Sequence, residues 1–269
     1  MTLRFDPYGI FRASKTPAGL YARQKWLAEE NSLVWKADFK STVDALLAGQ
    51  SRDGSWGGSV VQTIQRLFGL HLTVRDPNER IDKALDWLLD LALKKPQRIR
   101  RDVAERFSNE ALRGLPFTPG CSGLLLTGAT LFLATIFGRN RDPRILAAYA
   151  RLNKEGVERK VRWCGWSCSN NILRAFVVHP EFRKSRATDL AVKALARAQH
   201  SSGTWPVQVP FYQTLNALAH LDLADAHGQI ETALEHLFKT QNKDGTWGKA
   251  QKEWNTFLVV HALRNKGFL

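Results

Sequence analysis

The chain has 269 residues, of which 44% are hydrophobic, so it can bury a large core and we expect one globular domain. Its three cysteines are too few for a disulfide-stapled secreted scaffold. No apolar leader and no run of about eighteen apolar residues is present, so we expect a cytoplasmic protein. The formal charge of +14 at pH 7 suits a solvated surface, or an anionic neighbour such as a phosphorylated small molecule or a peripheral membrane contact. No recognised nucleic-acid-binding module accompanies it, which argues against nucleic acid as a partner.

At coarse scale, the sequence predicts an N-terminal arm over residues 1–19 and a single domain over residues 20–269. The domain opens with a predicted helix over 20–31, and apolar helical patterns then alternate with turn signals as far as the C-terminus. Each turn is followed by a predicted apolar helix, over 60–72, 121–137, 168–178, 211–223 and 254–263. A further segment over 103–112 brings the total to about eleven or twelve helices.

The turns carry a motif of Gln, three residues, Gly, one residue and Trp, which appears three times. Its copies occupy 50–56, 199–205 and 241–247, and the last two begin 42 residues apart. The glycine can take the left-handed conformation that ends a helix. The glutamine amide can satisfy backbone groups at the helix end while the indole covers the junction between hairpins. We therefore interpret both residues as structural clamps.

Weaker copies over 84–92 and 145–156 extend the repeat to five units. One hairpin cannot bury its own apolar stripe, so five or six hairpins must stack, and alternating inner and outer helices let the stack close on itself. The sequence thus predicts an all-α fold, an (α/α)5–6 toroid around a central cavity. The repeated motif resembles the QW motif of the terpenoid cyclase and protein prenyltransferase superfamily. Cys121, the Cys-x3-Cys of 164–168 and the PFYQT of 210–214 are similar to small prokaryotic prenyltransferase/squalene-oxidase-repeat proteins.

The resemblance to class II terpenoid cyclases stops at the catalytic acid. Those enzymes protonate an alkene with an Asp-x-Asp-Asp motif, whereas this chain has no Asp-Asp pair. Its nearest fragment, Asp222 with Asp225, is expected at a solvent-facing helix end. We therefore expect no class II cyclisation. Whether the chain is an enzyme stays open, and prenyl transfer is the candidate reaction that the resemblance implies.

Three cysteines, Cys121, Cys164 and Cys168, stand close to the starts of two successive predicted inner helices. If these helices point the same way, the thiols converge at one mouth of the cavity, where three thiolates would suit a tetrahedral zinc ion. Protein prenyltransferases, which the fold resembles, hold zinc with Asp, Cys and His, and their Asp-x-Cys pattern has no match here. The alternatives are three small buried hydrophobic residues or one reactive thiol.

Aromatic and amide residues near the starts of the inner helices are the candidate lining of the cavity. They are Trp166, Phe211, Tyr212, Trp254, Asn170 and Gln213. Aromatic faces suit an isoprenoid chain, although core packing explains them equally well. Arg159, Lys160 and Arg162 are candidate anion-binding residues for a diphosphate head, since guanidinium groups match phosphate oxygens.

These features favour a toroid that binds a hydrophobic, isoprenoid or prenyl-diphosphate-like ligand in an aromatic cavity, with prenyl transfer at a cysteine-bound zinc as its enzymatic version. The alternative is a non-catalytic interaction scaffold, whose basic surface docks an acidic protein or a membrane. Strong salt dependence of partner binding together with an empty cavity would favour the scaffold.

Overall fold

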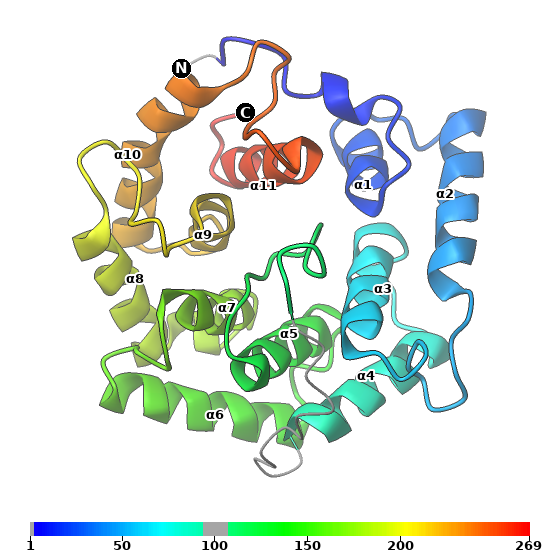
Figure 1. Ribbon diagram of the computed structural model, residues 1–269, viewed down its shortest axis with the longest axis horizontal. Helices are drawn as coiled ribbons and strands as arrows, with labels where there is room; N and C mark the ends of the chain where they lie inside the picture. The colour runs from blue at the N-terminus through cyan, green and yellow to red at the C-terminus, as the bar shows by residue number, and fades with distance from the viewer. Residues whose placement is uncertain (1–2, 94–106) are drawn as a thin grey trace.

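A computed structural model of the chain describes residues 3–93 and 107–269, and its helices alternate between an inner and an outer ring (Figure 1). The inner ring consists of α1 (Pro17–Lys25), α3 (Val60–Thr73), α5 (Ser122–Ile136), α7 (Trp166–Phe176), α9 (Phe211–Leu218) and α11 (Lys252–Asn265). The outer ring consists of α2 (Leu33–Leu47), α4 (Glu79–Leu93), α6 (Pro143–Glu158), α8 (Arg186–Ala198) and α10 (Ala224–Thr240). Two short 3-10 turns are η1 (Gly9–Phe11) and η3 (Phe182–Lys184). The predicted all-α class is confirmed, with eleven α-helices in the described ranges. None of these helices is long and apolar enough to cross a bilayer.

The ring that each helix joins follows from the distribution of its apolar residues. α5 has the sequence SGLLLTGATLFLATI, and every residue from Leu125 to Thr135 is buried. A helix that is apolar on all sides needs neighbours on all sides, and α5 packs against α3, α4, α6 and α7. α8 instead buries one stripe of residues spaced three or four apart, which include Ala187, Ala191 and Leu195. That single stripe suits an outer helix with one face in solvent.

The first helix differs from its prediction over 20–31. It spans Pro17–Lys25, because the hydroxyl of Thr16 accepts a hydrogen bond from the Gly19 N–H and so caps a helix that begins with proline. Soon after its end, Ala28 has a positive φ of 54° that no helix can accommodate. The division of the chain into an arm and a domain stays a prediction.

Two later boundaries also differ. α9 ends at Leu218 rather than at 223, because the chain must turn within a few residues to begin α10 at Ala224. Residues 107–112 of the segment predicted as a helix over 103–112 form loop and turns, and the rest of that segment lies outside the described residues.

The glutamine of each repeat ties successive hairpins together. Its Nε2 donates to the carbonyl of the glycine four residues on, and also to a second carbonyl that is distant in the sequence. In the first two copies the second acceptor belongs to the next outer helix, Arg80 O for Gln50 and Gln229 O for Gln199. In the third copy it is Phe5 O, and the Phe5 N–H donates back to Gln241 Oε1 at 3.2 Å. The N-terminal segment thus takes the place of a next outer helix and closes the ring.

The tryptophan of each repeat is buried at the junction of two hairpins. Its Nε1 donates to a backbone carbonyl near the end of the preceding outer helix, Ala48 O for Trp56, Leu195 O for Trp205 and Leu237 O for Trp247. Trp163 makes the equivalent bond to Leu152 O after the weaker repeat of 145–156. These contacts agree with the interpretation of Gln and Trp as structural clamps.

Candidate ligand-binding cavity and thiol cluster

One cavity, the entrance, opens between the starts of α1 and α11, the middle of α3 and residues 113–115. It has a volume of about 450 Å³. The loop at its side is held in place, because Trp254 Nε1 donates to Leu115 O at 3.0 Å and Gln65 Nε2 donates to Ala111 O at 2.8 Å. Glu253 is the one carboxylate on the described lining, and the hydroxyls of Ser14 and Thr16 hydrogen-bond to it. The entrance thus has ordered walls.

A second cavity, the chamber, lies between α3, α5, α7, α9 and α11 and has a volume of about 230 Å³. It shares Phe68, Leu72 and Trp254 with the entrance, so the two spaces adjoin at these side chains. The Phe68 and Trp254 rings meet edge to face at 5.8 Å, and Trp254 stacks on Phe257 at 5.2 Å. Phe132 and Tyr21 continue this wall, with ring centroids 6.1 Å from Phe68 and 5.3 Å from Phe257. The chamber therefore has a continuous aromatic wall.

Arg174 projects into this apolar chamber from the last turn of α7. Only 5% of the residue is exposed, and its Nε and Nη1 atoms are buried without a hydrogen-bond partner. Its guanidinium lies over the Phe132 ring at 5.5 Å. No carboxylate occurs among the described residues that line the chamber. Burial lowers the pKa of Arg174 to about 9, so the side chain still carries its charge at neutral pH.

Three histidines, His71, His220 and His261, also line the chamber, and we call them the chamber histidines. Burial, with a further contribution from nearby arginines, lowers the pKa of His71 and of His261 to about 4. The same causes hold the pKa of His220 well below its usual value. All three imidazoles are therefore neutral at pH 7. His71 Nδ1 and His220 Nε2 have no hydrogen-bond partner, so polar atoms around Arg174 are free to bind a ligand.

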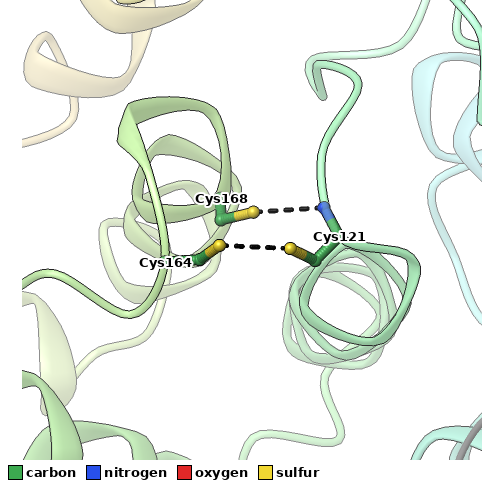
Figure 2. Close-up of side chains that lie close together, drawn as sticks. All are labelled: Cys121, Cys164 and Cys168. Carbon is green, nitrogen blue, oxygen red and sulfur yellow. Dashed lines mark hydrogen bonds between the residues drawn. The ribbon is translucent and has the colours of Figure 1, made fainter.

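The three cysteines converge between the starts of α5 and α7 (Figure 2). Cys121 is the N-cap of α5, Cys164 lies just before α7, and Cys168 is in the first turn of α7. Their sulfurs all lie within 4.8 Å of one another, and the Sγ atoms of Cys121 and Cys164 are 3.2 Å apart. The Cys121 N–H donates to Cys168 Sγ at 3.1 Å. The thiols thus come together, but none of the three cysteines lines the entrance or the chamber.

The pKa values of Cys121 and Cys164 are shifted in opposite directions. The hydrogen bond with Cys164 raises the pKa of Cys121, and the same bond lowers the pKa of Cys164. Cys164 is thus the more readily ionised of this pair. Both lie close to helix N-termini, whose partial positive charge favours a thiolate.

Arg159, Lys160 and Arg162 line a groove of about 980 Å³ on the outside of α7. Cys164, Trp166 and Arg197 also line it. The predicted anion-binding residues are exposed there, so their charges are solvated, and the groove is separate from the central cavities.

Among the predicted lining residues, Trp254 lies in the central cavities. Trp166 and Asn170 instead line a small cleft on the α8 side of α7. Phe211 packs against Trp205, Tyr212 and His236, while Gln213 is half-buried in the first turn of α9. These residues are thus distributed over several surfaces rather than one.

Sequence reasoning missed Arg174, His71 and His220 as residues of the chamber. A signal for Arg174 was present, since it is the only charged residue of α7, whose sequence is WSCSNNILRAF. A lone arginine within a buried stretch needs a partner or a function.

No protein-family model and no curated protein matches the sequence. Solved structures do resemble the fold. A variant of the type II terpene cyclase MstE from Scytonema, in complex with the substrate geranylgeranyl dihydroxybenzoate, matches with a TM-score of 0.58 and 12% identity over 93% of this chain and 87% of that chain. Another MstE variant, in complex with the product merosterolic acid A, has a TM-score of 0.58, 13% identity and coverages of 94% and 88%. A protein from Actinoplanes has a TM-score of 0.60, 17% identity and coverages of 98% and 90%. The chain therefore has the α/α-toroid fold of a type II terpene cyclase over nearly its whole length.

Proposed function

We propose that this protein binds an apolar, isoprenoid-like molecule in the chamber and entrance at the centre of the toroid. The observation that carries the proposal is the continuous aromatic wall, which runs from Tyr21 through Phe257 and Trp254 to Phe68. Aromatic faces provide a large apolar contact area for an isoprenoid chain, and they attract positive charge that develops on its carbons. Ligand cavities in proteins typically measure about 300–1,000 Å³, and the entrance alone falls in this range.

The solved structures support this ligand class. MstE, which shares the toroid fold, holds geranylgeranyl dihydroxybenzoate as substrate and merosterolic acid A as product. Among the described residues of the present chain, the chamber has no carboxylate that could protonate an alkene, and Glu253, on the entrance, accepts hydrogen bonds from the hydroxyls of Ser14 and Thr16. The proposed function is therefore binding of an isoprenoid rather than its acid-initiated cyclisation.

Calorimetric titration with farnesol tests the proposal. In Val178→Phe, a larger side chain would occupy part of the chamber, so we expect farnesol binding to weaken at least about tenfold. Val157→Phe is the matched control, because Val157 is exposed on α6. Equal farnesol affinity in Val178→Phe and Val157→Phe would contradict binding in the chamber. Failure of both farnesol and its anionic analogues to bind the unaltered protein would favour the interaction scaffold instead.

A second proposal concerns the thiol cluster, which we propose to be a zinc site. With Zn–S bonds of about 2.3 Å and tetrahedral angles, bound sulfurs stand roughly 3.8 Å apart. The three sulfurs lie within 4.8 Å of one another and those of Cys121 and Cys164 are 3.2 Å apart, so a rotation of the side chains would bring them to this spacing. Zinc with three protein ligands keeps a fourth position for water or a substrate and acts there as a Lewis acid. Prenyl transfer to a thiol would use such a position.

Metal analysis and cobalt substitution test the zinc site. Under reducing conditions, we expect one equivalent of zinc, and the cobalt form should show the intense near-ultraviolet absorption of cobalt–thiolate bonds. Cys164→Ser and Cys168→Ser should each lower the metal content, whereas Ser122→Ala at the start of α5 should leave it unchanged. Unchanged occupancy in both cysteine variants would contradict the proposal. A Cys121–Cys164 disulfide formed with no metal bound would identify the cluster as a redox pair instead.

A further inference from the structure

The chamber contains a buried positive charge that no described residue neutralises. Arg174 is a buried cation, two of its nitrogens lack any partner, and no carboxylate faces it among the described residues. An unpaired buried charge is costly, and proteins tolerate such a group mainly where it has a function. The cation–π contact with Phe132 offsets only a part of this cost.

Among the residues that the structure describes, the other polar groups around the chamber also carry no negative charge. Arg75 Nη2 is buried without a partner, and the charge of this residue lowers the pKa of both His71 and His261. Asn216 Nδ2 donates to Leu258 O, which leaves its Oδ1 unpaired. The described part of the chamber thus combines an apolar wall with positive charge and unused hydrogen-bonding atoms, which suits an apolar ligand that ends in a polar, anionic group.

We propose that the chamber holds the acidic head group of the ligand, a singly charged carboxylate that pairs with Arg174. This inference rests on the proposed function. The paired N–H groups of a guanidinium match the two oxygens of a carboxylate, and one negative charge neutralises Arg174. The apolar body would then extend past Phe68, Leu72 and Trp254 into the entrance. A diphosphate carries more charge than Arg174 and Arg75 together can neutralise in a buried space.

The head group therefore lies inside the ring and not at the basic groove. Arg159, Lys160 and Arg162 are exposed, and solvated charges gain little from pairing with an anion. Arg174 is already desolvated, so a carboxylate that reaches it forms a stronger ion pair and relieves an existing cost.

Titration calorimetry with three probes of equal chain length tests the inference. Farnesoic acid, farnesol and farnesyl diphosphate are titrated into protein stripped of bound lipid. The unaltered protein should bind farnesoic acid roughly 10- to 100-fold more tightly than farnesol. Arg174→Met should abolish this preference by weakening the binding of farnesoic acid, whereas Arg174→Lys should retain a part of it. Arg197→Met, in the basic groove, is the matched control and should keep the full preference.

Each other outcome is informative. Equal binding of acid and alcohol by the unaltered protein, or an acid preference that survives Arg174→Met, would overturn the inference and leave the proposed function intact. Tightest binding of farnesyl diphosphate, dependent on Arg174, would overturn the carboxylate assignment. Failure of all three probes to bind would refute the proposed function itself.

A thermal melt of the ligand-free variant provides a second readout. Arg174→Met removes an unpaired charge and keeps a side chain of similar length, so we expect an unchanged or raised Tm. A fall of more than a few degrees would identify Arg174 as a structural residue and overturn the inference.

Discussion

Trp247 is the most informative residue with which to test the stacked-hairpin interpretation. It is fully buried, and its indole Nε1 donates to Leu237 O at 2.9 Å. Truncation of a buried aromatic side chain to alanine costs about 3–5 kcal/mol. For Trp247→Ala we expect a loss at the upper end of this range, because Leu237 O would also lose its hydrogen-bond partner at a further cost of about 1–3 kcal/mol. For a domain of this size, the expected fall in Tm is roughly 10 °C.

Equilibrium unfolding in guanidinium chloride measures this loss. Trp166→Ala is the matched control, since Trp166 is 37% exposed and its truncation should cost below about 1 kcal/mol. Trp247→Phe separates the two contributions, because it keeps most of the packing and removes only the N–H donor. A loss for Trp247→Ala below about 1 kcal/mol, or equal to that of Trp166→Ala, would refute the role of this tryptophan as a junction clamp.

The remaining predictions concern pH and ring closure. Burial lowers the pKa of the chamber histidines in the folded protein. As the pH falls below the ordinary pKa of histidine, the unfolded chain therefore takes up protons at these residues before the folded chain does. As the pH is lowered from about 6.5 to 4, the free energy of unfolding should therefore decrease, by up to about 1.4 kcal/mol per pH unit for each histidine. Unfolding midpoints that are flat from pH 6.5 to 5 would contradict this. Gly245→Ala should be more destabilising than Gly57→Ala, because a Cβ at Gly245 would lie 1.8 Å from Asp6 O, whereas nothing lies within 4 Å at Gly57. Both have positive φ and share a cost of about 1–2 kcal/mol, so equal unfolding midpoints would mean that the N-terminal segment does not close the ring as described.

The repeated motif predicted the fold because it repeats one local solution to one packing problem. Gln50, Gln199 and Gln241 each bridge two carbonyls, and the spacing of these bridges sets the alternation of inner and outer helices. Helix ends were harder to predict, since they depend on tertiary demands such as the turn from Leu218 to Ala224.

Only those site residues were predicted whose chemical type and position in the repeat both indicate a site. The thiol cluster was accessible to sequence reasoning because cysteines near the starts of adjacent inner helices must meet if those helices are parallel. The chamber was not predicted, because His71 on α3, Arg174 on α7 and His220 in the turn after α9 are far apart in the chain. The orientation of α7 determines whether Arg174 or Trp166 lines the central cavity. The sequence does not indicate this orientation, because both faces of the helix carry aromatic or polar residues.

A crystal structure of the protein grown with farnesoic acid would test the central claim most directly. The account predicts density for the apolar chain beside Phe68 and Trp254, with the carboxylate within hydrogen-bond distance of Arg174. Density confined to the groove lined by Arg159, Lys160 and Arg162, with the chamber empty, would contradict it.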